Sequence, residues 1–357
     1  MKKTLAMLLA LVMMVGLLAG CGGTKEESKA PESQAPASTA PEKAPESEAP
    51  AEPEGWKPEK SVEIIINGSA GGSTDLLGRA VEAVWDKYCD QPVVITNMPG
   101  GGGVIGEAYV ATSDADGYTL GFNYGGGTDL SMPHLQKLDY DPYTMLDPVC
   151  LLSVHTVFIA APADSKFENM ADVVAWSEET GNPITVSVST ANGTTDLTAQ
   201  AIKYYTGMDM NIVPHDGGAP AVADLLSGSY TIGAHVLSEI RSHVESGQLK
   251  ILAVSSPERD SAAPDVPTLL EQGIDFSAPG SVKGVSVPEG TDAAIVAYYE
   301  ELFAEICADE EFAKIMSDLG QPIMYKNTEE FSKFFDESNE FYKNTIEALG
   351  LAYYQQK

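Results

Sequence analysis

The chain has 357 residues, of which 21 are Lys or Arg and 52 are Asp or Glu, so its formal net charge is −31. A chain this acidic lacks the basic surface that attracts nucleic acid or anionic lipid, and both classes of partner are excluded. The four cysteines are scattered, and none of the five histidines stands in a metal-binding pattern, so we expect neither a metal site nor a cofactor.

The first 20 residues have the pattern of a secretory signal. Lys2 and Lys3 precede an apolar run, 5–18, which is too short to span a bilayer and ends in LAGC at 18–21. This ending resembles the bacterial lipobox, in which the signal is cut before a cysteine that is then lipidated. We therefore expect acylated Cys21 to anchor the mature protein in the lipid bilayer, on the outer face of the cell membrane or in the periplasm; the alternative is a plain secretory signal.

Residues 21–55 are expected to be a disordered tether. From residue 22 onward they are mostly Pro, Glu, Ala, Ser and Lys, with no apolar side chain larger than Ala, and such a composition cannot bury enough surface to fold. About 300 residues remain, which favours two domains. We place the first at 56–158 with 283–357 and the second at 159–282, with chain crossings near 152–162 and 281–288.

A turn between a strand and a helix is the first candidate site. The apolar run 64–66 predicts a buried strand, and the spacing of apolar residues predicts a helix over 76–88. Glycines between them let the backbone approach a ligand, and a Ser-Thr pair can cap the helix. The free N–H groups of a helix N-terminus bind anions, although most capped turns bind nothing. The candidates are Asn67, Gly68, Ser69, Gly71, Gly72, Ser73, Thr74 and Asp75.

Two further strands, predicted at 92–96 and 119–122, also end in glycine-rich loops. The glycines of 100–106 fit the dinucleotide pattern GxGxxG, but their separation from the strand favours a simple loop beside a cleft, before a helix at 107–112. Alternating strands and helices predict a parallel α/β sheet, whose ligands bind at the carboxyl ends of the strands. Asn123 and Thr128, in the loop after the third strand, therefore join the candidates.

The second half repeats this order. We expect one long apolar strand over 151–161, a helix over 170–180 and a strand over 184–189, which leads into STANGTTD at 189–196. This loop matches the first turn, so two helix N-termini can face one anion, as in a two-domain clamp. Neither turn contains Lys or Arg, and we expect backbone N–H groups and hydroxyls to hold the anion without a basic side chain. The candidates here are Thr190, Asn192, Gly193, Thr194 and Thr195.

Further strands are expected at 211–213 and 250–255 around a helix at 219–226, and residues 291–357 are helical by pattern. An enzyme would need a nucleophile–base or acid–base pair, and the sequence contains no such signature. We therefore expect no catalytic residues and no enzymatic activity.

The motifs of the folded part, taken in order, resemble one family. They are AGGSTD at 70–75, QPVVITNMPGGGG with IG at 91–106, DGYTL at 116–120, NGT at 192–194, APA with DLL at 219–226, GQLKILAV at 247–254 and PDVPTLLEQG at 264–273. The family is that of the substrate-binding proteins of tripartite tricarboxylate transporters, the Bug-type extracytoplasmic solute receptors. The resemblance implies a periplasmic-binding-protein-like fold, with two α/β domains around a ligand cleft. It also implies capture of a small carboxylate for the membrane subunits of a tripartite transporter; the alternative is presentation of the ligand to a membrane sensor kinase.

The chain departs from the family at several candidate positions. Asn67 and Gly68 stand where the family usually has proline and an aromatic residue, which should widen the pocket. His215 stands where tyrosine is typical, and His235 falls where aspartate is common. Both histidines are candidates for ligand contact, with ordinary packing as the alternative.

Overall fold

The computed structural model describes residues 55–355. The signal sequence, Cys21 and nearly all of the tether lie outside these residues, and so do the expectations that concern them. Within the described part of the chain, no helix combines the length and apolar character that crossing a membrane requires.

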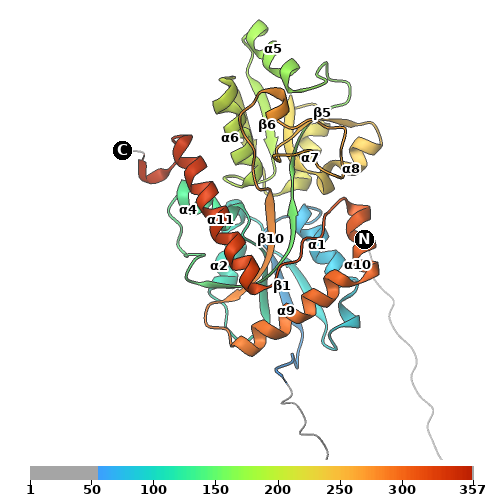
Figure 1. Ribbon diagram of the computed structural model, residues 1–357, viewed down its shortest axis with the longest axis vertical. Helices are drawn as coiled ribbons and strands as arrows, with labels where there is room; N and C mark the ends of the chain where they lie inside the picture. The colour runs from blue at the N-terminus through green and yellow to red at the C-terminus, as the bar shows by residue number, and fades with distance from the viewer. Residues whose placement is uncertain (1–54, 356–357) are drawn as a thin grey trace, which may run out of the picture. The chain divides into compact units, whose positions relative to one another are not determined.

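Within residues 55–355, ten strands form two five-stranded sheets (Figure 1). The first sheet has the order β2 (Val93–Asn97), β1 (Val62–Ile66), β3 (Thr119–Tyr124), β10 (Ser281–Pro288) and β4 (Leu146–His155). The second has the order β7 (Met210–Pro214), β6 (Ile184–Val188), β8 (Ile232–Val236), β5 (Val157–Pro162) and β9 (Leu249–Val254). An α/β fold is therefore confirmed.

Both sheets are mixed, so the prediction of a parallel sheet holds for the three strands β1, β2 and β3 but not for the whole sheet. β1 runs parallel to β2 and β3, whereas β10 runs antiparallel to both β3 and β4. In the second sheet β6 is parallel to β7 and β8, and β5 is antiparallel to β8 and β9. The reason is that β5 and β10 are not reached through βα units; each follows a passage of the chain from the other sheet, which reverses its direction.

The predicted strand over 151–161 is in fact two strands in different sheets. β4 ends at His155 in the first sheet, and β5 begins at Val157 in the second. Periodicity cannot reveal the change, because both strands are buried on both faces and read as one apolar run. The chain crosses back before β10. The domain boundaries themselves remain a prediction.

We call each sheet with the helices that pack on it a lobe. The first lobe has α1 (Ser73–Glu82), α2 (Val104–Ala111), α3 (Gly127–Leu130), α4 (Met132–Leu135), α9 (Ala293–Ala308), α10 (Glu310–Leu319) and α11 (Thr328–Ala348). The second lobe has α5 (Met170–Thr180), α6 (Thr194–Thr206), α7 (Gly218–Leu226) and α8 (Leu237–Glu245). Short 3₁₀ turns occupy Trp85–Lys87, Gly101–Gly103, Leu270–Gln272 and Tyr353–Gln355.

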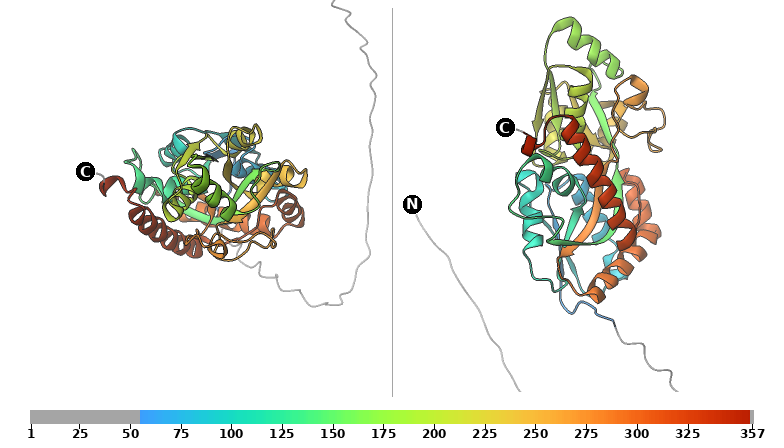
Figure 2. Two further views of the ribbon diagram at one scale, coloured as in Figure 1. Left: turned by 90° about the horizontal axis from the view of Figure 1, so that it is seen from above. Right: turned by 60° about the vertical axis from the view of Figure 1, so that its left-hand side comes forward.

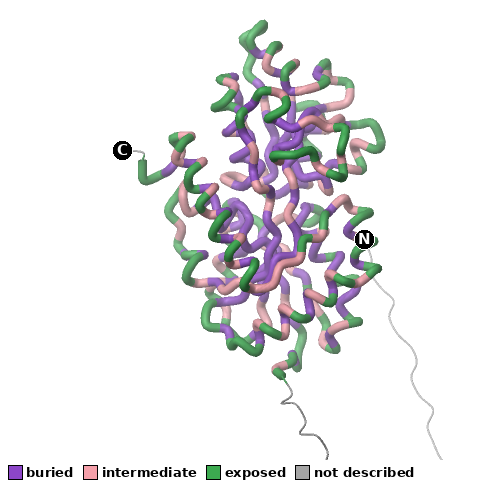
Figure 3. The backbone as a smooth tube through the Cα atoms, viewed as in Figure 1, coloured by how far each residue is buried: buried purple, intermediate pink, exposed green. Residues whose placement is uncertain are grey.

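The strands form the buried centre of each lobe, as Figure 3 shows in purple. Ile64, Ile65 and Ile66 of β1 are at most 1 % exposed, because helices cover both faces of the sheet. The C-terminal helices pack mainly on the first lobe, as expected (Figure 2, right). α11 also reaches the second lobe, where Phe341 packs against its core.

Candidate functional site

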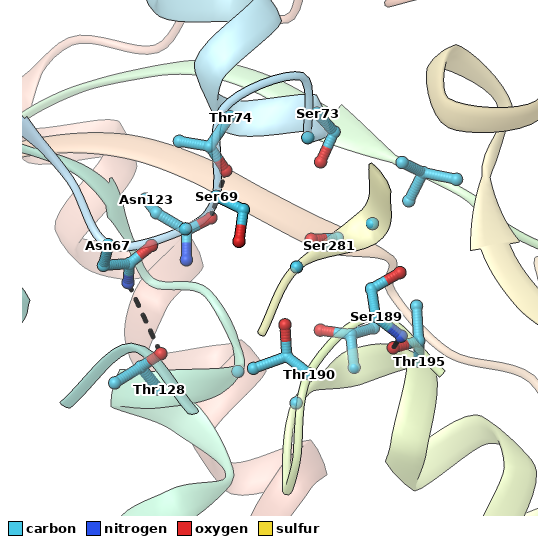
Figure 4. Close-up of a pocket in the computed structure, with 18 of the residues that line it drawn as sticks. Asn67, Ser69, Ser73, Thr74, Asn123, Thr128, Ser189, Thr190, Thr195 and Ser281 are labelled. Carbon is cyan, nitrogen blue, oxygen red and sulfur yellow. Dashed lines mark hydrogen bonds between the residues drawn. The ribbon is translucent and has the colours of Figure 1, made fainter. Parts of the chain in front are cut away.

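A cavity of about 70 Å³ lies between the two lobes, at the carboxyl ends of β1, β3 and β6. Figure 4 shows its polar lining, with hydroxyl and amide side chains from both lobes turned toward the same space. Most of the predicted candidates line it: Asn67, Gly68, Ser69, Gly72, Ser73, Thr74, Asp75, Asn123, Thr128, Thr190, Gly193, Thr194 and Thr195. Outside the lining lie Gly71, Asn192, His215 and His235.

Three turns of one design surround the cavity. They read GGSTD at 71–75, GGGTD at 125–129 and NGTTD at 192–196. In each turn the aspartate carboxylate accepts the N–H of the residue four positions earlier, over 2.8, 3.1 and 2.7 Å respectively. In each, a glycine with extended backbone is the N-cap of the following helix. The aspartates thus hold the turns in shape, and the turn at 125–129 was recognisable from the sequence only as a glycine-rich loop.

The helix caps differ from expectation. Gly72, and neither Ser73 nor Thr74, is the N-cap of α1, and no side chain caps the helix. The N–H groups of Gly71 and Gly72 are occupied within the turn, by Asp75 Oδ2 at 2.8 Å and by the Ser69 carbonyl at 3.1 Å. These two N–H groups therefore have no free hydrogen for an anion, contrary to the sequence-based prediction.

Free backbone N–H donors remain at the first residues of α1 and α6, after the N-cap glycines. The first helical hydrogen bond of α1 runs from the Leu76 N–H to the Gly72 carbonyl, so Ser73 and Thr74 have no acceptor within the helix. In α6 the equivalent bond runs from Leu197 to Gly193, which leaves Thr194 and Thr195 in the same position. Each helix N-terminus also carries a partial positive charge toward the cavity. The two helices can therefore bind one anion between them.

A buried lysine adds a full positive charge. Lys283 of β10 is only 5 % exposed, and its Nζ donates to Asn123 Oδ1 at 2.7 Å and Thr74 Oγ1 at 3.0 Å. Burial lowers the pKa of Lys283 from 10.5 to about 8, although the nearby Glu239 acts in the opposite direction. The ammonium is therefore still mostly protonated at pH 7. The sequence-based expectation included no basic side chain in the cleft, but a lysine from a distant strand lines it.

The acceptor of this lysine is held in an unusual backbone conformation. Asn123 has a φ of 102°, which is rare for a residue other than glycine. The conformation places its side chain beside both Thr74 Oγ1, at 3.3 Å, and Lys283. Strain of this kind concentrates at ligand-binding sites, where the surrounding structure maintains it.

A carboxylate on the second lobe also lines the cavity. Glu239 Oε2 accepts a hydrogen bond from Ser189 Oγ at 2.9 Å and lies 3.5 Å from His235 Nδ1. His235 is fully buried, and its Nε2 lies 3.2 Å from Ser187 Oγ. His235 therefore acts from behind the cavity wall and positions Glu239. The other histidine, His215, lies 3.0 Å from Asp224 Oδ2 and 3.2 Å from the Val188 carbonyl.

On the first lobe, Asn67 contacts the buried acid Glu107, which lies near a second buried acid, Asp129. Its Nδ2 donates to Glu107 Oε1 at 2.8 Å and lies 3.4 Å from Thr128 Oγ1. Burial, and then the nearby Asp129, raise the pKa of Glu107 well above its usual range, which favours its protonated form. Burial also raises the pKa of Asp129, to about 7, against hydrogen bonds from Gly125 and Tyr140. Asn67 is thus fixed in place by the core, with its remaining polar atom available to the cavity.

The lobes touch at the rim of the cavity. Ser69 donates to the Asp216 carbonyl, and Ser131 donates to the Asn192 carbonyl. A Cβ atom built on Gly127 would lie 2.5 Å from Gly193 Cα, so this glycine permits the approach. These contacts join the two lobes at the rim of the cavity.

The cavity contains nine residues that the sequence reasoning did not select: Gly102, Gly127, Ser189, Gly217, Gly218, Val236, Glu239, Ser281 and Lys283. Most of these nine residues are close in the chain to residues that were selected and lie in the same loops. Lys283 carried one signal, since it is a charged residue within the otherwise apolar strand VKGVSV. Glu239 carried none, because nothing in a helix sequence indicates that a carboxylate faces a cleft.

Comparison with known proteins agrees with this geometry. Residues 77–351 match the profile described as tripartite tricarboxylate transporter family receptor. Protein BugT of Bordetella pertussis is 28 % identical over 240 residues, which are 67 % of this chain and 74 % of that protein. The structure of the periplasmic binding protein BugD superimposes with a TM-score of 0.77 at 26 % identity, over 83 % of this chain and 99 % of that one.

A third match is the structure of R. palustris Rpa4515 with adipate, which has a TM-score of 0.78 at 24 % identity, over 83 % of this chain and 99 % of that one. These matches confirm the predicted periplasmic-binding-protein-like fold and the predicted family, which is one of solute receptors and not of enzymes. The chain belongs to the tripartite tricarboxylate transporter family of receptors.

Proposed function

We propose that this receptor captures a small carboxylate and delivers it to the membrane subunits of a tripartite transporter. The observation that carries the proposal is Lys283, whose buried ammonium lies beside the N-terminus of α1 in the cavity that α6 also faces. One full and two partial positive charges thus converge on one small polar space. The adipate held by Rpa4515, which shares the fold, supports the choice of carboxylates as ligands.

Lys283 has the capacity for a ligand contact. An ammonium group has three N–H donors, and two of them are used by Asn123 and Thr74. The third has no acceptor among the described residues, and a ligand carboxylate oxygen would supply one. Hydrogen bonds between charged groups are each worth about 1.5–3 kcal/mol, and the N–H groups of Ser73, Thr74, Thr194 and Thr195 add to this.

We further propose that the two predicted domains open and close around the ligand. Small-angle scattering tests this part: the radius of gyration of the full chain should fall when ligand is added. An unchanged radius at saturating ligand would count against a moving clamp.

The anchor remains part of the proposal. Acylation at Cys21 would hold the receptor at the outer face of the membrane, near the transporter subunits, and the tether would supply reach. Intact-mass measurement of the mature protein should show a lipid-modified chain that begins at Cys21. An unmodified Cys21 would leave a secreted, unanchored receptor.

The ligand itself can be identified without a prior guess. The full chain is purified without added carboxylate and denatured, and the released small molecules are identified by mass spectrometry. A carboxylate released in proportion to protein is expected from wild type, and a smaller amount per protein is expected from a Lys283→Met variant. Release of a molecule without a carboxylate group in its place would contradict the proposed function.

A further inference from the structure

The cavity has a fixed negative charge that a simple carboxylate receptor does not need. Of the charged residues in its lining, Lys283 suits a ligand carboxylate, whereas Asp75 and Glu239 do not. Asp75 already has partners in its own turn and helix: its Oδ2 accepts the Gly71 N–H, and its Oδ1 forms an ion pair with Arg79, whose Nε lies 3.4 Å away. Glu239 is the acid whose role in the lining is unexplained.

The contacts of Glu239 leave one oxygen available. Both Ser189 Oγ and His235 Nδ1 approach Oε2, and no described residue donates a hydrogen bond to Oε1. The carboxylate lies over Gly218 at the N-terminus of α7, where a Cβ atom would overlap Oε1. Gly218 thus keeps room for this carboxylate in the cavity wall, and the helix N-terminus favours its negative charge.

The carboxylate is ionised at neutral pH. Burial acts to raise the pKa of Glu239, but His235, the Ser189 hydroxyl and Lys283 together outweigh burial and lower the pKa. A buried carboxylate with an unpaired oxygen is costly once the lobes exclude water, unless a cationic group of the ligand pairs with it. A plain dicarboxylate would instead bring two more negative charges toward it.

We propose that the ligand is an amino-carboxylate, whose carboxylate binds Lys283 and the helix N-termini and whose ammonium group donates to Glu239. The inference rests on the proposed function and narrows it to one class of ligand. In this arrangement Lys283 of β10 and Glu239 of the second lobe recognise opposite ends of a zwitterion, and both buried charges of the cavity acquire a partner when the clamp closes.

Matched ligand pairs test the proposal. Succinate and aspartate differ by one amine, as do propionate and alanine, and each is titrated calorimetrically into the full chain at pH 7. The account expects the amine-bearing member of the tighter-binding pair to bind at least about tenfold better, as one hydrogen bond between charged groups provides. Malate, with a hydroxyl at the same carbon, should lie between succinate and aspartate.

The Glu239→Gln variant keeps the shape and removes the charge, so the preference for the amine should fall by about tenfold or more. A purely structural role would weaken both members of a pair equally and leave their ratio unchanged, which would overturn the proposal. Glu179→Gln, an exposed change on α5, is the control and should keep the wild-type ratio.

The outcomes distinguish a failure of the amino-carboxylate proposal from a failure of the proposed function. Tight succinate binding with no gain for aspartate in wild type overturns the amino-carboxylate and leaves the proposed function standing. Failure of all five ligands to bind, with no carboxylate released on denaturation, overturns both the amino-carboxylate and the proposed function. If Glu239→Gln does not fold, as judged by circular dichroism, the wild-type preference still decides the question.

Discussion

Replacement of Lys283 by methionine should change ligand binding and stability in opposite directions. Methionine has a similar shape but no charge, so the ligand loses one charge-assisted hydrogen bond of about 1.5–3 kcal/mol. Since about 1.4 kcal/mol is a factor of ten, binding of a carboxylate should weaken by about ten- to 150-fold. The helix N-termini remain, so some affinity should persist.

The stability of the ligand-free protein should rise. The pKa of Lys283 falls from 10.5 to about 8 on folding, and at about 1.4 kcal/mol per pH unit the buried charge costs about 3 kcal/mol at pH 7. Methionine removes this cost. It also removes the hydrogen bonds that Lys283 donates to Asn123 Oδ1 and Thr74 Oγ1, and this loss destabilises the variant by about 1–2 kcal/mol. The variant should therefore be about 1–2 kcal/mol more stable than wild type.

The stability difference between wild type and the Lys283→Met variant should depend on pH. A base with a lowered folded-state pKa costs stability fully below about pH 8, and the cost disappears as the pH rises from 8 to 10.5. Urea denaturation should therefore show a variant advantage at pH 7 that narrows above pH 8. Lys314→Met, an exposed change on α10, is the control. A Lys283→Met protein that binds normally and is less stable than wild type would refute the account of the cleft.

Three further results are expected. Carboxylate affinity of wild type should fall as the pH rises through about 8, where Lys283 loses its proton; a flat calorimetric profile between pH 6 and 10 would argue against a lysine contact. Gly127→Ala should weaken ligand binding, because the added Cβ would meet Gly193 as the lobes close, but should leave the melting temperature of the ligand-free protein nearly unchanged. In small-angle scattering, the radius of gyration of the variant should fall less on ligand addition than that of wild type. Glu107 has a raised pKa, so its contribution to stability is full below about pH 4 and is lost as the pH rises. The free energy of unfolding, measured by urea titration at pH 5 and pH 8, should therefore decline less in Glu107→Gln than in wild type. An equally steep decline in the variant would contradict the raised pKa.

The sequence predicted those parts of the site that depend on neighbouring residues. The turns at 71–75 and 192–196 were recognisable because glycine, hydroxyl residues and aspartate follow a buried strand in a fixed order. The helix over Met170–Thr180 was predicted with its observed bounds; in the structure Asn169 caps it and Gly181 ends it.

The parts that depend on distant residues were not predictable in the same way. Lys283 lies 209 positions from Thr74, and only the return of β10 between β3 and β4 brings them together. The helix expected over 76–88 ends at Glu82, because Val84 and the 3₁₀ turn after it bend the chain so that Trp85 enters the core. Tertiary packing decided both outcomes, and no local pattern records it.

The most direct test of the account is a crystal structure of the protein with its bound carboxylate. The account predicts a carboxylate oxygen within hydrogen-bond distance of Lys283 Nζ, with further contacts to N–H groups at the starts of α1 and α6. A ligand bound instead in the larger cavity of about 810 Å³ beside Arg241 and Arg259, with Lys283 still bonded only to Asn123 and Thr74, would contradict it.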